Sequence, residues 1–259
     1  DFGTAFAPQG KHELDKYTRL WELTSSRYIF GMTAYLEYLN TQFDPEKQRF
    51  KLHTQFNFEP KPGKNQETGI GADDLQTIIQ TNGPFAIFEF TGAFPRAKLF
   101  NDWRMSESDA QTLSVLSNPD FDAAKTALVS EGKIPDGQNG TTEGSAEISS
   151  YAPKEIQVKT SSDSASLLVL NDRYHSDWKV YVNAKPAPML RCNYLMRGVF
   201  VPEGENQVTF RFEHSSSGLY AGIFAWVFAF GIFGFGLREK IEPTKPLEDK
   251  PKDNSIETV

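Results

Sequence analysis

The residues with the clearest chemical potential lie in one short run, Asp172-Arg173-Tyr174-His175-Ser176-Asp177-Trp178. Asp172 and His175 have the residue types of an acid/base pair or of part of a metal site. A metal site needs further ligands close by, and His12, His53 and His214 are isolated in the sequence. No paired-histidine, paired-cysteine or paired-carboxylate motif occurs. We therefore predict no catalytic residue and no metal ligand in this chain.

Two interpretations of this run remain. The first is a loop between two strands, whose Tyr174 and Trp178 pack onto a sheet, and the composition favours it. The second is a sugar-binding loop, because an aromatic face beside polar groups suits a carbohydrate. For this second interpretation the candidate ligand-binding residues are Asp172, Tyr174, His175, Trp178 and Arg197.

Charge and cysteine content exclude several other functions. The 259 residues carry a net charge of −7 and have no basic stripe, so nucleic acid is not an expected partner. Cys192 is the single cysteine, which rules out an intrachain disulfide, and its apolar neighbours predict a packed rather than a reactive thiol. No motif indicates a cofactor.

The first half, residues 1–148, predicts an α+β region. Leu14–Leu23 has helical periodicity, and Arg49–Phe58 alternates as a half-buried strand does. Further strands are expected at Arg27–Phe30, Phe85–Phe90 and Arg96–Phe100. Ser108 and Gln111 fit a capping box that opens a helix. Residues 130–147 are rich in glycine and predict a linker or long loop.

The second half, residues 149–216, predicts an antiparallel β-sandwich. Leu167–Leu170 is a continuous apolar run, as in a strand that is covered on both faces. Trp178–Val182 and Val208–Phe212 alternate between apolar and polar residues, and turn residues separate the strands. The expected fold class is therefore mainly β with a few helices, followed by one C-terminal transmembrane helix.

That helix is predicted from Gly218–Leu237, which contains no charged residue. At about 1.5 Å per residue it would be about 30 Å long, which matches the hydrocarbon thickness of a bilayer. Arg238, Lys240 and Lys245 follow, so the tail 238–259 is expected in the cytoplasm and the β-rich part outside. The tail is rich in proline and charge and is expected to be disordered.

Small residues form one stripe along this helix at about 100° per residue, as the period of an α-helix predicts. In lipid, small side chains let helix backbones approach closely. We therefore expect this stripe to pack against other transmembrane helices of the same protein or of a partner. The residues are Gly218, Ala221, Gly222, Ala225, Ala229 and Gly236.

From Leu167 to Phe230 the chain resembles the C-terminal end of the bacterial YfhO-type membrane proteins. That family shows an apolar strand and an aspartate, a Tyr and a Trp about four apart, an Asn-Tyr-x-x-Arg segment, a Pro-x-Gly turn and a last membrane helix. Trp21–Phe30 and Gly92–Phe100 resemble upstream family segments. One departure is Ala184, where the family usually has glycine in a hairpin. The matching positions are Asp172, Tyr174, Trp178, Asn193, Tyr194, Arg197, Pro202 and Gly204.

The resemblance implies a multi-pass protein of the bacterial cell membrane, similar to glycosyltransferases that use polyprenyl-phosphate sugars. Its partners would be the membrane, other helices, and a lipid-linked sugar or envelope glycan. The family's catalytic acidic residue lies in an early outer loop that is not in this sequence, so this chain alone is expected to be inactive. The start DFGTAFAPQG is no signal peptide, and we expect a longer protein. The alternative is a β-sandwich that binds glycan or protein without catalysis and is tethered by one helix.

Overall fold

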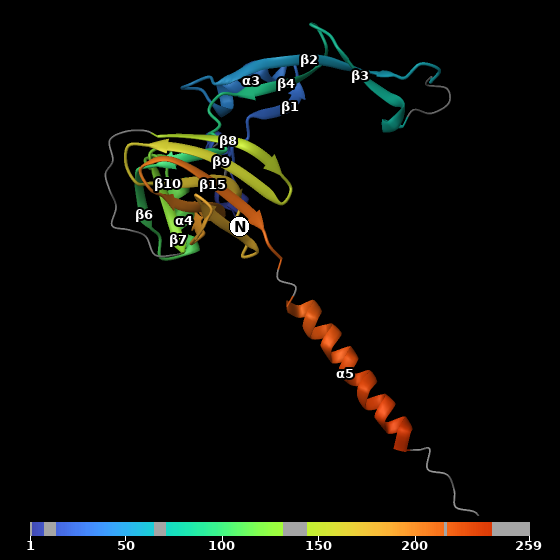
Figure 1. Ribbon diagram of the computed structural model, residues 1–259. Helices are drawn as coiled ribbons and strands as arrows, with labels where there is room; N and C mark the ends of the chain where they lie inside the picture. Colours follow the sequence, from blue (N-terminus) through green and yellow to red (C-terminus); the bar gives the residue numbers. More distant parts are fainter. Residues whose placement is uncertain (1, 8–13, 65–70, 132–143, 215–216, 240–259) are drawn as a thin grey trace, which may run out of the picture. The chain divides into compact units, whose positions relative to one another are not determined.

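The computed structural model describes residues 2–7, 14–64, 71–131, 144–214 and 217–239 (Figure 1). The chain divides into two units, Asp1–Glu213 and His214–Val259. Strands dominate the first unit. Its helices are α1 (Phe2–Ala5), α2 (Asp15–Leu23), α3 (Tyr35–Tyr38), the π-helical turn η1 (Leu39–Phe43), the 3₁₀ turn η3 (Ala72–Asp74) and α4 (Asp109–Ser117).

Three sheets are present in the described part of the first unit. The four-stranded sheet has the order β1-β4-β2-β3, the six-stranded sheet β5-β10-β14-β13-β7-β6, and the five-stranded sheet β12-β11-β15-β9-β8. All pairings are antiparallel except β6 with β7. The strands are β1 (Tyr28–Met32), β2 (Phe50–Pro60), β3 (Leu75–Ile79), β4 (Phe85–Phe90), β5 (Ala97–Phe100), β6 (Asp102–Met105), β7 (Thr126–Glu131), β8 (Ser145–Ala152), β9 (Glu155–Ser162), β10 (Ser166–Arg173), β11 (Trp178–Val182), β12 (Lys185–Ala187), β13 (Leu190–Cys192), β14 (Met196–Val201) and β15 (Gly204–Phe212).

The six- and five-stranded sheets pack face to face as a sandwich, in which β10 lies between β5 and β14. Leu168 and Leu170 point into the core between the two sheets, where they meet Val158 and Phe210. Leu167 and Val169 belong to a second core on the opposite face of the six-stranded sheet. Both pairs are fully or almost fully buried, so the prediction that this run is covered on both faces is confirmed.

The structure does not divide at the predicted boundary between 148 and 149. Strand β8 crosses that point and pairs with β9 from Ser145 to Ala152. Strands β5, β6 and β7 from the first half also belong to the sandwich. The alternation of a single strand cannot show which partner it will find, so the sequence could not reveal that distant strands complete the six-stranded sheet. Most of the expected linker lies outside the described residues, as does the tail from 240 onward.

The four-stranded sheet has its own core. Phe50, Phe88 and Phe90 are buried on one face of the sheet, together with Leu39. Trp21 of α2 packs against this cluster, with its ring edge-on to Phe50 at 5.8 Å between centroids. The opposite face of the sheet carries exposed aromatic side chains, which are considered below.

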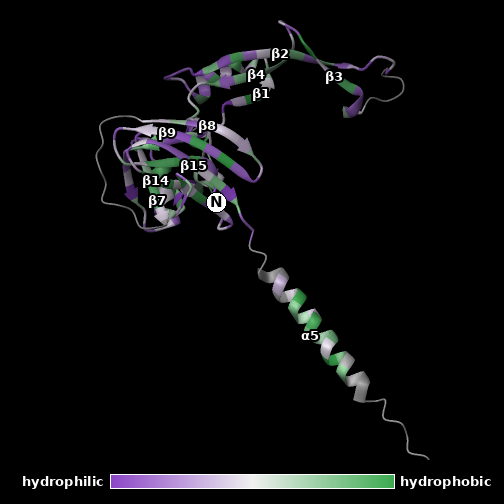
Figure 2. Cartoon of the chain, viewed as in Figure 1, coloured by the Kyte–Doolittle hydropathy of each residue, from purple (hydrophilic) through white to green (hydrophobic). Residues whose placement is uncertain are grey.

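Helix α5 (Ser217–Glu239) belongs to the second unit, and Figure 2 shows hydrophobic residues in its middle part. Within the residues that the structure describes, no helix is both long and apolar enough to cross a membrane. The transmembrane span expected at Gly218–Leu237 therefore lacks structural support. Gly218, Ala221 and Gly236 of the expected small-residue stripe lie outside the residues whose burial the structure describes.

Candidate functional site: an arginine–aspartate cluster and two hollows

Three of the five predicted site residues come together at the end of β10. The Asp172 carboxylate lies 3.3 Å from Nη2 of Arg197 and 2.6 Å from Nη2 of Arg96. The Tyr151 hydroxyl donates to the same carboxylate at 3.2 Å. Asp172 and Arg197 are buried, whereas about half of the Arg96 side chain is exposed. One buried carboxylate therefore pairs with two guanidinium groups, and these three side chains together carry one net positive charge.

Trp178 completes this cluster from the first position of β11. The Arg197 guanidinium carbon lies 3.9 Å from the centre of the indole ring, in a cation–π contact. The Nη1 atom of Arg197 is buried and has no hydrogen-bond partner in the described structure. The contact with the indole ring offsets part of the cost of burying this group. Because Arg197 covers one face of the indole, that face is closed to a sugar ring. The predicted role of Trp178 in ligand binding stays a prediction.

The electrostatics of the cluster follow from burial and pairing. Hydrogen bonding to Asp172 raises the pKa of Arg96 above its ordinary value. Burial lowers the pKa of Arg197, and the charge of Asp172 only partly offsets this effect. Burial, together with the nearby negative charge of Asp172, raises the pKa of Tyr151. Both arginines remain charged at neutral pH, so the cluster is an ion-pair network without a poised acid or base.

The other two predicted residues lie in the loop before β11. The backbone N–H of Tyr174 donates to the Leu195 carbonyl at 2.7 Å. His175 is exposed, and its Nδ1 accepts a hydrogen bond from the Asp177 backbone N–H at 3.2 Å. Asp172 is engaged by arginines, so the structure does not build an acid/base pair from Asp172 and His175. Nor does any group of three or more His, Cys, Asp or Glu among the described residues have metal-binding geometry.

Tyr174 borders a hollow of about 760 Å³ that the sequence did not indicate. Arg173 is exposed there beside the Tyr194 ring, which stacks on Phe2 at 5.5 Å between centroids. Arg191 also lines the hollow, but its Nη2 is paired with Asp109 at 2.7 Å. An exposed guanidinium beside aromatic rings is a surface to which an acidic saccharide can bind.

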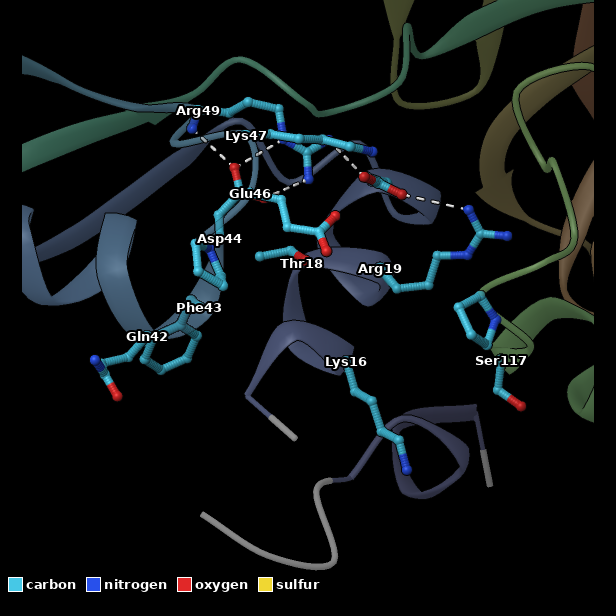
Figure 3. Close-up of a pocket in the computed structure, with 13 residues that line it drawn as sticks. Lys16, Thr18, Arg19, Gln42, Phe43, Asp44, Glu46, Lys47, Arg49 and Ser117 are labelled. Atoms are coloured by element: carbon cyan, nitrogen blue, oxygen red, sulfur yellow. Dashed lines mark hydrogen bonds and ion pairs between the residues drawn. The ribbon is translucent and has the colours of Figure 1, made fainter. Parts of the chain in front are cut away.

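A second hollow, of about 520 Å³, lies between α2, the segment after η1 and the end of α4 (Figure 3). Arg49 donates through Nε and Nη2 to Asp44 at 2.8 and 2.9 Å, and through Nη1 to Glu22 at 2.6 Å. Arg19 approaches the other oxygen of Glu22 at 3.4 Å. Both buried carboxylates are therefore satisfied, and this hollow contains a closed ion-pair network that ties α2 to the start of β2.

Burial and pairing act in opposite directions on these charges. Burial alone would raise the pKa of Asp44, but hydrogen bonds from the side chain and backbone of Arg49 outweigh it and hold that pKa below its usual value. Burial alone would lower the pKa of Arg49, but hydrogen bonds to Asp44 and Glu22 raise it overall. Both pKa values are therefore shifted away from neutral pH, whereas a general acid or base needs a pKa close to the pH at which it works.

Several residues of the YfhO-like pattern have structural roles. Asn193 has φ of 43°, donates its backbone N–H to the Leu128 carbonyl and accepts the Leu128 N–H on its side-chain oxygen. The side chain of Asn206 donates to the carbonyls of Pro202 and Gly204, and Gly204 has φ of 90°. The pattern therefore fixes turns between strands of the sandwich. Comparison of the chain with protein-family models, curated proteins and solved structures gave no match.

Proposed function

We propose that this chain is the extracytoplasmic β-rich part and the last membrane helix of a YfhO-like integral membrane protein. The complete protein would transfer a sugar from a polyprenyl-phosphate carrier to a polymer of the bacterial cell envelope. This chain would hold and orient that machinery without providing a catalytic residue. The observation that carries the proposal is the apolar surface of α5.

The described side chains of α5 are exposed and apolar both in the small-residue stripe, at Gly222, Ala225 and Ala229, and away from it. The large side chains have exposed fractions of 73% at Phe224, 68% at Trp226 and 64% at Phe230. A helix that is hydrophobic on all sides is stable only when other apolar groups surround it. In the proposal these groups are lipid chains and neighbouring membrane helices, and the tail after α5 is cytoplasmic.

The chemistry of the first unit supports a non-catalytic role. In both ion-pair networks, around Asp172 and around Arg49, the buried carboxylates are held by guanidinium groups. A general acid or base must exchange a proton with a substrate. The buried carboxylates of both networks are already engaged by guanidinium groups, so the proposal assigns catalysis to another part of the complete protein.

The small-residue stripe of α5 supplies a test. No heavy atom lies within 4 Å of a Cβ built on Gly222, so the described part of the chain places nothing against it. Replacing Gly222 and Ala225 by phenylalanine in the complete protein is expected to block close approach of a neighbouring helix and to lower its abundance in the membrane several-fold. Phe224→Leu, about 120° away on the same helix, is the matched control and should leave the abundance unchanged. Equal abundance of the double variant and the control would refute docking through the stripe.

The second candidate function is a glycan-binding module, and the hollow beside Arg173 and Tyr174 favours it. It predicts that the chain binds an acidic envelope polysaccharide and that Arg173→Ala weakens this binding at least tenfold. A glycan array on which the chain binds no envelope polysaccharide would exclude this candidate.

A further inference from the structure

Strand β1 forms one edge of the four-stranded sheet, and its hydrogen bonds show which groups face outward. Phe90 N–H donates to the Arg27 carbonyl at 2.7 Å, and Thr33 N–H donates to the Pro84 carbonyl at 2.9 Å. In an antiparallel pair such bonds recur at every second residue, so Ile29 and Gly31 also face β4. The N–H and C=O groups of Tyr28, Phe30 and Met32 therefore point away from the sheet.

Within the described ranges, no strand pairs with this outer edge of β1. Exposed edges usually carry charged residues, proline or a bulge that prevents pairing with another chain. Strand β1 has the sequence YIFGM, which contains neither a charged residue nor a proline. Its pairing with β4 has no register shift and therefore no bulge. The β1 edge is therefore free to accept another strand.

The side chains along this edge are apolar and exposed. Tyr28, Phe30 and Met32 are 55%, 61% and 47% exposed. The Phe30 ring stacks on Phe56 at 5.9 Å and on Phe85 at 6.0 Å, so it lies at the margin of an aromatic surface. An incoming strand would gain backbone hydrogen bonds and contacts with these rings together.

On the other face of β1, an apolar hollow of about 500 Å³ opens beside Gly31. Tyr35 and Tyr38 of α3 form part of its wall, together with Phe88 of the neighbouring strand β4. The missing side chain of Gly31 does not enlarge this hollow, because the Phe88 ring lies 3.2 Å from the position that a Cβ would take.

We propose that β1 is a self-association edge, which pairs in antiparallel orientation with β1 of a second copy of this chain around a two-fold axis at Phe30. In this register Phe30 faces Phe30 of the second copy, and Tyr28 faces its Met32. Ile29 of the second copy then lies opposite Gly31, next to the apolar hollow. All three outward-facing residues of each strand form backbone hydrogen bonds across the axis.

Self-complementarity favours a second copy over an unrelated chain. A two-fold interface needs a surface that fits itself, and the β1 sequence brings no like charges together across the axis. Arg27, the nearest charge before the strand, would face the uncharged Thr33 of the second copy. Aromatic–aromatic and methionine–aromatic pairs are favourable neighbours on one face of a sheet.

A disulfide test reads out both the contact and its register. Across the proposed axis the two Cα atoms of residue 30 lie about 5.5 Å apart, which is within the range for a disulfide. The two Cα atoms of residue 32 lie roughly 14 Å apart, which is too far. The full chain carrying Phe30→Cys, oxidised in mild detergent, should form at least ten times more covalent dimer than Met32→Cys. Cys192 is buried and should not contribute.

A second pair of variants separates this edge from association through α5. Phe30→Lys places like charges opposite each other and should raise the dimer dissociation constant at least tenfold in analytical ultracentrifugation. Ile79→Lys is the matched control, because Ile79 is exposed on β3 at the other edge of the same sheet. Failure of Phe30→Cys to cross-link, or equal effects of the two lysine variants, would overturn the proposal. Protection of the β1 amides from hydrogen exchange without cross-linking would also overturn it and would indicate another occupant.

Discussion

Asp172 is the residue whose removal should destabilise the sandwich most. It is ion-paired with Arg197, which is buried, and accepts hydrogen bonds from Arg96, which is about half exposed. Replacing Asp172 by asparagine removes the negative charge but keeps the shape. Arg197 is then left as an uncompensated buried cation, packed on the Trp178 ring.

The expected loss of stability follows from the burial of Arg197. Removing one partner of a buried ion pair typically costs about 3–5 kcal/mol, because the remaining charge cannot be hydrated. The comparison variant Arg96→Met should cost at most about 1 kcal/mol, because that side chain is half exposed and Asp172 keeps its pairing with Arg197. The expected difference between the two variants is therefore at least about 2 kcal/mol.

The assay is urea denaturation of the whole chain in mild detergent, followed by tryptophan fluorescence and extrapolated to zero urea. A rescue variant makes the reasoning more specific. Asp172→Asn combined with Arg197→Met removes the buried cation and lets the methionine pack on Trp178, so it should be more stable than Asp172→Asn alone. A cost below about 1 kcal/mol for Asp172→Asn, or no rescue, would refute this account of the cluster.

Three further predictions concern single positions. Ala184 has φ of 62° and forms a two-residue turn with Asn183. Ala184→Gly should relieve this backbone strain and raise the free energy of unfolding by about 0.5–1 kcal/mol in the same urea assay. A loss of stability would show that Ala184 is not strained. Burial raises the pKa of the Cys192 thiol, so a thiol reagent should label it only after denaturation, and rapid labelling of the folded chain would show that it is accessible. Because Arg49 holds the folded-state pKa of Asp44 below its unfolded value, the stabilisation is present above about pH 4 and is lost as pH falls through the folded pKa. Asp44→Asn should therefore reduce stability at pH 7 and flatten its decline in acid, and an unchanged acid limb would exclude this role of Asp44.

Local patterns predicted much of the sandwich correctly. The apolar run Leu167–Leu170 lies between two cores, and the Ser108 hydroxyl accepts a hydrogen bond from Gln111 N–H at 3.2 Å as the N-cap of α4. These features depend on neighbours within a few residues, which the sequence shows directly. Gln111 departs from the full capping box, because its side chain accepts from the N–H of Glu107 instead of that of Ser108.

Long-range pairing could not be predicted in the same way. Strand β6 contains only four residues and pairs in parallel with β7, and its sequence DWRM carries no clear alternation. Arg96 and Tyr151 join Asp172 from positions 76 and 21 residues away along the chain. A single sequence gives no signal for such contacts, because charge and aromatic character alone do not specify a partner. Asp172, Trp178 and Arg197 were predicted as members of one candidate site, whereas Arg96 and Tyr151 were not.

The surface of β1 also shows where pattern and structure differ. Arg27–Phe30 was predicted as a strand, but alternation cannot say whether a strand lies at the edge or in the middle of a sheet. The sheet order and the hydrogen bonds of Arg27 and Thr33 supply that information. The sequence alone therefore could not show that β1 is an edge strand with unpaired backbone groups.

The most direct test of the central proposal is whether α5 holds the chain in a membrane. The full chain, expressed in bacteria, is separated into soluble and membrane fractions, and the membranes are washed with alkaline carbonate. The account predicts that the chain stays in the washed membranes and that Ala225→Lys with Phe228→Lys releases it into the soluble fraction, because charges in the apolar part of a membrane helix are costly. Recovery of the unaltered chain in the soluble fraction would contradict the proposal.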